Sequence, residues 1–173
     1  LINPNEALYP PLCYGDANGS ISIDITGGTS LLNYYWLNGT GTADSLYALV
    51  EGVYTLVVID SAGTDTFNFF LQGPQLLEVD LIVEDSVLPC FGALTVMDVL
   101  ISGGMSPYSI NWNDADTNQQ KIADAGYYEV EITDSNGCSS NDSILITEPD
   151  SLQITITYTN IGCNEGTSAT VTT

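Results

Sequence analysis

The sequence predicts an all-β protein built from tandem immunoglobulin-like antiparallel β-sandwich repeats. Three observations support this prediction: apolar and polar residues alternate along most of the chain, turn-forming residues separate the alternating runs, and one set of landmarks occurs twice. No amphipathic helix of convincing length interrupts the pattern. With 173 residues, the chain is long enough for two small domains that each bury a modest core.

Period-two alternation indicates half-buried strands, because successive side chains of a strand point to opposite faces of the sheet. It occurs in SISIDI (20–25), YTLVVID (54–60), LEVDLIVE (77–84), YEVEITD (128–134), SILIT (143–147) and LQITITYT (152–159). Turn formers lie between the runs, as in DANG (16–19), NGTG (38–41), DSAG (60–63) and DSNG (134–137). The spacing is typical of an antiparallel sandwich, although other Greek-key sandwiches share this periodicity.

The two halves of the chain carry the same landmarks in the same order. SGGMSPYSINW (102–112) echoes TGGTSLLNYYW (26–36). The intervals between matching positions are 77 residues from Cys13 to Cys90, 76 from Trp36 to Trp112, and 75 from Pro74 to Pro149. Cys163 then follows Cys90 by 73 residues. We therefore expect one repeat over residues 1–74, a second over 75–149, and the start of a truncated third over 150–173.

The charge of the chain argues against several classes of function. Asp and Glu total 22 against one basic residue, Lys121, and there is no histidine. Nucleic acid is not an expected partner because phosphate contacts need clustered Lys and Arg, and an anionic membrane surface is disfavoured for the same reason. No apolar run approaches the ~20 residues of a membrane helix, so we expect no direct membrane insertion. The first residues lack signal-peptide features, and we expect a mature piece of a longer protein.

Few residues suit catalysis or metal binding. Without His or Arg, neither a Ser-His-Asp nor a Cys-His arrangement can be assembled, and no carboxylate pair stands out. We therefore expect no enzyme active site and no cofactor. A cysteine metal site is disfavoured because there is no C-x-x-C motif. Aspartates at turns could supply oxygen ligands to calcium, although such residues more commonly bond their own turn backbone. They are Asp60, Asp65, Asp134 and Asp142.

Four aromatic residues have an expected structural role. Trp36 and Trp112 occur once per repeat on a central strand, where a core residue is more common than a sugar-stacking platform. Tyr54 and Tyr128 follow a glycine by two residues at the head of a late strand, as tyrosine-corner residues do. We therefore expect all four in or beside the core.

The repeat has a recognisable internal pattern. In the second repeat it reads CFG (90–92), GGMSPYSINW (103–112), AGYYEVEITDSNGC (125–138) and EPDSL (148–152). The first repeat matches with CYG (13–15), NGSI (18–21), GG (27–28), YYWLNG (34–39), GVYTLVVID (52–60) and GPQLL (73–77). In this pattern the chain resembles the SprB repeats of the giant cell-surface adhesins of gliding bacteria. The resemblance implies export by the type IX pathway, and as partners it implies further repeats of the same chain and the secretion and motility machinery.

The resemblance leads to a hypothesis about the cysteines. The pattern has an opening cysteine and, in the second repeat, a second cysteine in a Gly-Cys pair (137–138), which we call the G-C cysteine. If each repeat joins its opening cysteine to its G-C cysteine, Cys90 pairs with Cys138, whereas Cys13 and Cys163 stay unpaired within this chain. The first repeat has Thr64 where the second has Cys138, so that repeat has no such pair. Four cysteines allow three connectivities, and the others remain open. A disulfide would imply an oxidising, extracellular compartment.

A modification signal accompanies the resemblance. Five aspartates precede a serine that is followed by a small or aliphatic residue, which resembles the O-glycosylation acceptor of the bacteria that make these adhesins. The alternative is ordinary Asp-Ser turn chemistry. The serines are Ser45, Ser61, Ser86, Ser143 and Ser151.

We therefore predict a stalk segment of a long, secreted cell-surface adhesin that serves surface attachment and gliding motility. Another part of the protein would contact the extracellular surface or polysaccharide. One alternative is a carbohydrate-binding or accessory module of a secreted hydrolase, with a platform of Tyr34, Tyr35, Tyr108 and Tyr127. Another is a surface filament subunit, joined through strand edges or Cys13.

Overall fold

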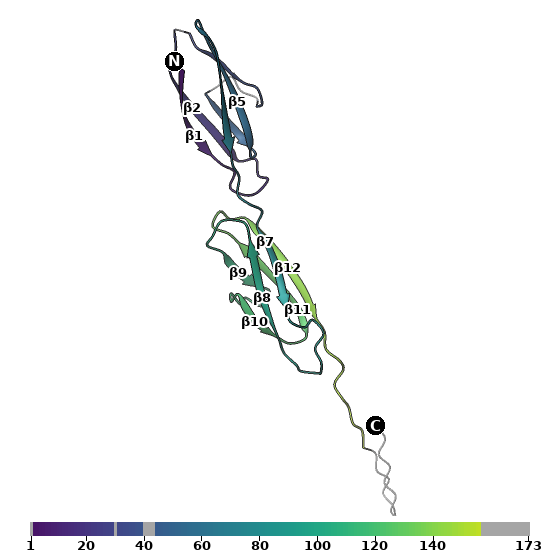
Figure 1. The fold of residues 1–173 in the computed structure, drawn as a ribbon. Helices are drawn as coiled ribbons and strands as arrows, with labels where there is room; N and C mark the ends of the chain where they lie inside the picture. The colour runs from purple at the N-terminus through teal and green to yellow at the C-terminus, as the bar shows by residue number, and fades with distance from the viewer. Residues whose placement is uncertain (1, 30, 40–43, 157–173) are drawn as a thin grey trace, which may run out of the picture.

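The computed structural model describes residues 2–29, 31–39 and 44–156 of the chain. Within these ranges the backbone forms strands β1 to β12 and no helix, so the predicted all-β fold class is confirmed. The same ranges hold no helix long and apolar enough to cross a membrane. The strands make two immunoglobulin-like β-sandwiches that follow one another end to end (Figure 1).

The first sandwich consists of two antiparallel three-stranded sheets. Their strand orders are β1-β2-β4 and β3-β5-β6. The strands are β1 (Ile2–Tyr9), β2 (Gly19–Gly27), β3 (Asn33–Trp36), β4 (Ser45–Leu49), β5 (Gly52–Asp60) and β6 (Gly63–Leu71). Apolar side chains of both sheets form one buried cluster, which includes Ile21, Trp36, Leu56 and Phe69.

The second sandwich repeats this topology strand for strand. Its sheets have the orders β7-β8-β10 and β9-β11-β12. The strands are β7 (Glu78–Val83), β8 (Thr95–Ser102), β9 (Ser109–Trp112), β10 (Gln120–Ala123), β11 (Gly126–Thr133) and β12 (Ser139–Ile146). Its own buried cluster includes Met97, Trp112, Val130 and Ile132. The repeat of landmarks in the sequence therefore corresponds to a repeat of the fold.

Burial in the strands follows the alternation of the sequence. In β8, Met97 and Val99 are buried, whereas their neighbours Asp98 and Leu100 are exposed. A one-residue slip in the register of β8 would turn Met97 and Val99 toward water and Asp98 toward the core. The alternation therefore fixes which face of each sheet is covered by the other sheet.

The two tryptophans lie inside the cores. Trp36 is 5% exposed and its ring centre lies 5.6 Å from that of Phe69. Trp112 is 1% exposed, and its Nε1 donates a hydrogen bond to the backbone oxygen of Asn118 at 2.9 Å. Lys121 Nζ lies 5.4 Å from the centre of the Trp112 ring. Neither ring presents a free face for stacking on a sugar.

The two tyrosines at the heads of β5 and β11 hold the preceding loops. Tyr54 Oη donates to the backbone oxygen of Val50 at 2.9 Å, and Tyr128 Oη donates to Asp124 Oδ1 at 2.6 Å. Burial raises the pKa of the Tyr128 hydroxyl, and the bond to the Asp124 carboxylate raises that pKa further. Both hydroxyls are therefore donors that join a strand to the loop before it.

Each sandwich builds its core without an internal disulfide among the described residues. In immunoglobulin domains the second core cysteine stands two residues after the corner tyrosine. Here those positions hold Leu56 and Val130, which are 1% and 0% exposed. Apolar packing thus occupies the place of the usual disulfide, and the three cysteines among the described residues, Cys13, Cys90 and Cys138, lie outside both cores.

We expect Tyr54→Phe to destabilise the first sandwich by about 1 kcal/mol, because it removes one partly buried hydrogen bond and keeps the ring. Urea unfolding followed by tryptophan fluorescence measures the effect. The matched control is Tyr47→Phe, since Tyr47 is 74% exposed. Equal unfolding midpoints for the two variants would contradict the proposed role of the Tyr54 hydroxyl.

Candidate functional site

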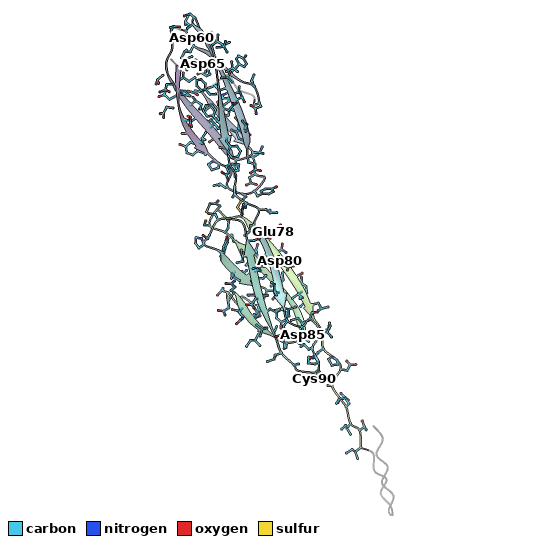
Figure 2. All side chains as sticks on the ribbon, viewed as in Figure 1. Asp60, Asp65, Glu78, Asp80, Asp85 and Cys90 are labelled. Carbon is cyan, nitrogen blue, oxygen red and sulfur yellow. A yellow bond between two sulfur atoms is a disulfide. The ribbon has the colours of Figure 1, made fainter. Side chains whose placement is uncertain are left out.

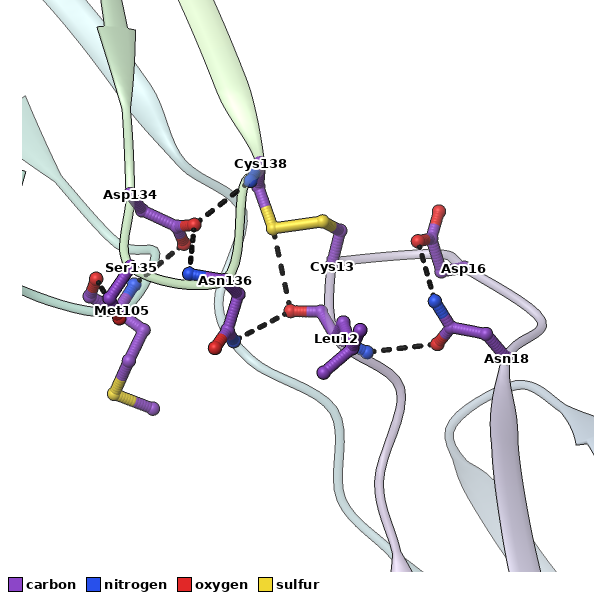
Figure 3. The surroundings of a disulfide bond; sticks show 9 residues. All are labelled: Leu12, Cys13, Asp16, Asn18, Met105, Asp134, Ser135, Asn136 and Cys138. Carbon is purple, nitrogen blue, oxygen red and sulfur yellow. Dashed lines mark hydrogen bonds between the residues drawn. A yellow bond between two sulfur atoms is a disulfide. The ribbon is translucent and has the colours of Figure 1, made fainter. Parts of the chain in front are cut away.

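The most distinctive site of the described chain is the junction between the two sandwiches. Three parts meet there: the β1–β2 loop (residues 10–18) of the first sandwich, the linker (residues 72–77), and the β11–β12 hairpin (residues 134–138) of the second. We call this set the junction. Figure 3 draws the disulfide of the junction and the hydrogen bonds around it.

A disulfide crosses the junction from Cys13 to Cys138 (Figure 3). The Cα atoms of the two residues lie 5.7 Å apart, although they are separated by 125 positions in the sequence. Cys90 is a free, exposed cysteine. The predicted pairing of Cys90 with Cys138 is therefore wrong, as is the expectation that Cys13 is unpaired; Cys163 lies outside the described residues.

The position of Cys90 explains why that pairing fails. Its loop lies beside the end of β12, where Leu88 N donates to Thr147 O at 2.7 Å and Gly92 N donates to Glu148 Oε2 at 2.6 Å. Cys138 directly precedes the start of β12. A strand of eight residues separates the two places, which is roughly 25 Å and far beyond the reach of a disulfide. Cys90 accordingly appears at the far end of the second sandwich in Figure 2.

Hydrogen bonds position both partners of the disulfide. Asn136 Nδ2 donates to the backbone oxygen of Leu12 at 2.9 Å, which adds a polar contact between the sandwiches. Asn18 Oδ1 accepts from the backbone nitrogen of Leu12 at 2.9 Å, and Asn18 Nδ2 donates to Asp16 Oδ2 at 3.1 Å. The loop that carries Cys13 is thus held from within its own sandwich while the hairpin contacts it from the other.

Asp134 organises the hairpin that carries Cys138. Its Oδ1 accepts from the backbone nitrogens of Asn136 and Cys138, both at 2.9 Å, and its Oδ2 accepts from Met105 N at 2.9 Å. The residue is 6% exposed. Burial alone would raise the pKa of the Asp134 carboxyl, but these backbone donors together hold the pKa below its ordinary value. The carboxylate therefore fixes the backbone that aims Cys138 at the first sandwich.

The β5–β6 turn of the first sandwich is also organised by an aspartate carboxylate that accepts backbone N–H groups, but this turn has no cysteine. Asp60 accepts from the backbone nitrogens of Thr29, Ala62 and Gly63 at 3.0, 2.7 and 3.0 Å. These bonds, led by that from Thr29, lower the pKa of the Asp60 carboxyl. Thr64 occupies the position that matches Cys138, so this turn is built like the junction hairpin but cannot form a disulfide.

The Gly-Gly pair of the second sandwich receives the linker. Gly103 has φ 67°, and a Cβ on it would lie 1.8 Å from the backbone oxygen of Leu76. Gly104 donates its backbone N–H to Gln75 O at 3.1 Å. Leu77, at the end of the linker, is 6% exposed and belongs to the second core. The linker is therefore packed against the second sandwich, and only glycine at 103 permits this approach.

The four aspartates suggested as calcium ligands are not brought together. Asp60 and Asp134 direct their carboxylates at turn backbone, and Asp142 Oδ2 accepts from Leu81 N at 2.8 Å. Asp65 lies on β6 opposite Val58. Among the described residues, no group of three His, Cys, Asp or Glu side chains is placed to hold a metal ion.

The four tyrosines of the suggested sugar platform do not share one surface. Tyr34 and Tyr35 are neighbours on β3 and point to opposite faces, and Tyr34 packs against the first core. Tyr108 and Tyr127 belong to the second sandwich and are 36% and 55% exposed. Tyr108 Oη donates to Gly103 O at 2.7 Å, beside the junction.

The serines of the suggested glycosylation motif are accessible in most cases. Ser45 lies in β4 and is half-buried. The other four are exposed: Ser61, Ser86, Ser143 and Ser151.

We expect Asp134→Asn to lower the free energy of unfolding of the second sandwich by roughly 1–3 kcal/mol, because an acceptor of several backbone N–H groups is replaced by an amide. The effect should depend on pH. A carboxyl whose pKa is lowered on folding stabilises the native state above the unfolded pKa of about 3.9, and this contribution is lost as the pH falls through the folded pKa. Thermal unfolding tests this when it is measured from pH 2, about two units below that unfolded pKa, to pH 7, about three units above it.

The matched control is Asp65→Asn, which makes the same change of charge on an exposed position of a strand. It should leave the acid transition of the second sandwich unchanged. If Asp134→Asn and Asp65→Asn shift the unfolding curves equally at all pH values, the carboxylate does not organise the hairpin.

Comparison with known proteins gives structural and family matches. A structure described as the basis for Dscam isoform specificity is 15% identical, with 86% of this chain and 46% of that chain covered and a TM-score of 0.37. The C-terminal 282-residue fragment of intimin, bound to the intimin-binding domain of its translocated receptor, is 10% identical, with 84% and 63% covered and a TM-score of 0.42. Murine CEACAM1b is 13% identical, with 84% and 100% covered and a TM-score of 0.36. The chain thus spans about half the length of the Dscam structure.

Comparison by sequence gives one family match. No characterised protein matches the chain by sequence. The family model of the SprB repeat matches residues 5–41, which include β1, the loop that carries Cys13, and β2. This match over residues 5–41 confirms the resemblance to the SprB-repeat family noted in the sequence.

Proposed function

We propose that the chain is a stalk segment of a long, secreted cell-surface adhesin, in which each repeat supplies length and stiffness. The observation that carries the proposal is the junction, where two sandwiches are joined twice: once by the linker and once by the Cys13–Cys138 disulfide. The SprB-repeat match supports the same function, since such repeats belong to cell-surface adhesins. The repeats we propose are residues 1–74 and 75–149, with a third beginning at 150.

Two connections restrict the angle between neighbouring sandwiches far more than one. Domains joined by a single flexible segment move relative to each other by default. Here the linker lies against Gly103 and Gly104, and the disulfide holds a second point of the interface. Rotation about the linker would have to stretch the disulfide or break the bond from Asn136 to Leu12. The junction therefore keeps the two long axes in one direction, as a stalk requires.

The composition suits a densely displayed surface polymer. The formal net charge is −21, with one basic residue in the chain. Like charge keeps neighbouring molecules soluble and opposes their lateral association. The four exposed serines of the Asp-Ser motif would add bulky, hydrated sugars if they are glycosylated. Both features favour separate, extended stalks.

The finer parts of the proposal derive from the resemblance. We propose export by the type IX pathway, a role in attachment and gliding motility, and contact with an extracellular surface or polysaccharide through another part of the protein. A disulfide is consistent with an oxidising compartment outside the cytoplasm.

Electron microscopy of the full-length protein, as its own cells release it, tests the stalk. Strands of eight or nine residues span about 25–30 Å, so we expect beads that repeat every few nanometres along a filament much longer than this segment. A compact catalytic body with only two or three beads would instead favour an accessory module of a secreted hydrolase.

We expect the double variant Cys13→Ser, Cys138→Ser to bend more freely at the junction. Small-angle X-ray scattering of the chain, with free thiols alkylated, should show a broader distribution of interatomic distances and a smaller mean length. Circular dichroism should be unchanged, because both cores form without the disulfide. Cys90→Ser is the matched control and should scatter like the parent chain. Identical scattering from the double variant and the parent would show that the disulfide does not stiffen the junction.

A further inference from the structure

Cys90 occupies in the second sandwich the place that Cys13 occupies in the first. The backbone nitrogen of Asp16 donates to Cys13 O, and that of Ala93 donates to Cys90 O, both at 3.1 Å. The glycine two positions after each cysteine has nearly the same conformation, with φ 77° at Gly15 and 72° at Gly92. The two loops therefore form the same turn.

The equivalence extends to the residues around the turn. Two positions before each cysteine, Pro11 and Leu88 are buried and anchor their loops to the sandwich. One position after each cysteine, Tyr14 and Phe91 are 54% and 62% exposed. Each loop thus has a buried anchor, a cysteine and an exposed aromatic ring in the same order.

The surface around Cys90 corresponds to one side of the junction. Between the sandwiches, Tyr14, Gln75 and Leu76 line a hollow whose other wall includes Asp134 and Cys138. At the far end of the second sandwich, a hollow is lined by the matching loop residue and the chain that leaves the sandwich: Phe91, Glu148, Pro149, Asp150, Ser151 and Gln153. The second hollow therefore has the same kind of loop-and-linker wall that the first sandwich contributes to the junction. Among the described residues, no hairpin forms a wall opposite to it.

We propose that Cys90 forms a disulfide with the G-C cysteine of the β-hairpin in the next repeat of the same protein. This inference rests on the proposed function, because it requires a further repeat. The chain beyond Pro149 begins such a unit, with the alternating run LQITITYT (152–159) followed by Cys163. Each opening cysteine then pairs with the hairpin cysteine of the next repeat, as Cys13 pairs with Cys138. By the same rule, Cys163, the opening cysteine of the third repeat, would pair with the hairpin cysteine of a fourth.

The bond forms by oxidation of two thiols. Cys90 and its partner lose two protons and two electrons, and the S–S bond forms between their sulfur atoms. The oxidant is the disulfide of a thiol–disulfide oxidoreductase, which takes up the electrons and protons and is left as two thiols. Exposure of Cys90 gives such an oxidant access to its sulfur.

The same rule identifies junctions without a disulfide. The hairpin residue at this position decides whether a repeat can accept the bond: Cys138 accepts it, whereas Thr64 at the matching position cannot. A repeat with threonine there is joined to its predecessor by the linker alone. The pattern of cysteine and threonine along an array would therefore set where it is stiff and where it bends.

Disulfide mapping of the native full-length protein tests the inference. The protein is collected from its own cells, its free thiols are alkylated in acid, and the unreduced digest is analysed by mass spectrometry. We expect the peptide of Cys90 joined to a peptide with the G-C cysteine of a following repeat. The Cys13–Cys138 pair in the same digest is the internal control. Cys90 recovered mostly in its alkylated form, or joined to Cys163, would overturn the proposal.

An engineered chain provides a matched pair of variants. A second copy of residues 75–149 is inserted after Pro149 in the full chain, so that a complete hairpin follows Cys90. We expect Cys90 to join the cysteine that corresponds to Cys138 in the inserted copy, with at least a tenfold loss of alkylation at Cys90. Replacing that cysteine of the copy by threonine, as at Thr64, should restore alkylation. Equal alkylation in both variants would contradict the proposal.

The outcomes separate this inference from the proposed stalk. If microscopy shows a beaded filament but Cys90 is alkylated in it, the stalk stands and the forward disulfide is wrong. If microscopy shows no array, the stalk proposal fails, and the inserted-copy chain still reports whether this junction geometry directs the pairing of Cys90.

Discussion

In these sandwiches the loop after the first strand and the hairpin between the last two strands lie at opposite ends, and the junction depends on this arrangement. Cys13 and Cys90 lie in the first kind of loop, and Cys138 lies in the second kind of hairpin. Roughly 25 Å of strand separates such places within one sandwich. When sandwiches follow one another along the chain, however, the loop of one meets the hairpin of the next. Cysteines at these two places can therefore bond only between neighbours.

The sequence predicts the sandwiches well because local chemistry determines them. Alternation in runs such as 128–134 and turn residues such as DSNG specify strands and hairpins within a few positions, and the tryptophans and corner tyrosines fall on the expected strands. The predicted Cys90–Cys138 disulfide is wrong because the order of cysteines along a repeat carries no information about which end of a domain each loop occupies. That information lies in how the strands pair in space, which puts the loop after β7 beside the end of β12 and the β11–β12 hairpin at the start of β12. The role of Gly103 in receiving Leu76 depends on the path of the linker, which no local motif records.

The cores and the junction use different chemistry, and this separation frees the cysteines. Leu56 and Val130 fill the positions at which immunoglobulin domains place a core cysteine, so apolar burial holds each sandwich together. The turn around Asp134 is set by backbone hydrogen bonds, and the equivalent Asp60 turn shows that this turn needs no cysteine. Cysteine or threonine can therefore occupy the hairpin position with the same surrounding structure. A repeat can gain or lose a covalent junction by one substitution without a change of fold.

The junction disulfide also determines how the chain would carry a load. Tension applied to the two ends passes along β1 to Cys13, crosses to Cys138, and continues along β12. Residues 14–137 lie inside the covalent loop and are bypassed, so they cannot be drawn out even if a sandwich unfolds. The loop also limits the unfolded chain, and closure of roughly 100 residues stabilises a fold by about 4.7 kcal/mol in the chain-entropy model. Because this loop includes β2 to β6 of the first sandwich and β7 to β11 of the second, that stabilisation is shared by both. A bond between neighbours thus limits extension and couples the stability of adjacent repeats, and a disulfide inside one sandwich would provide only local stability.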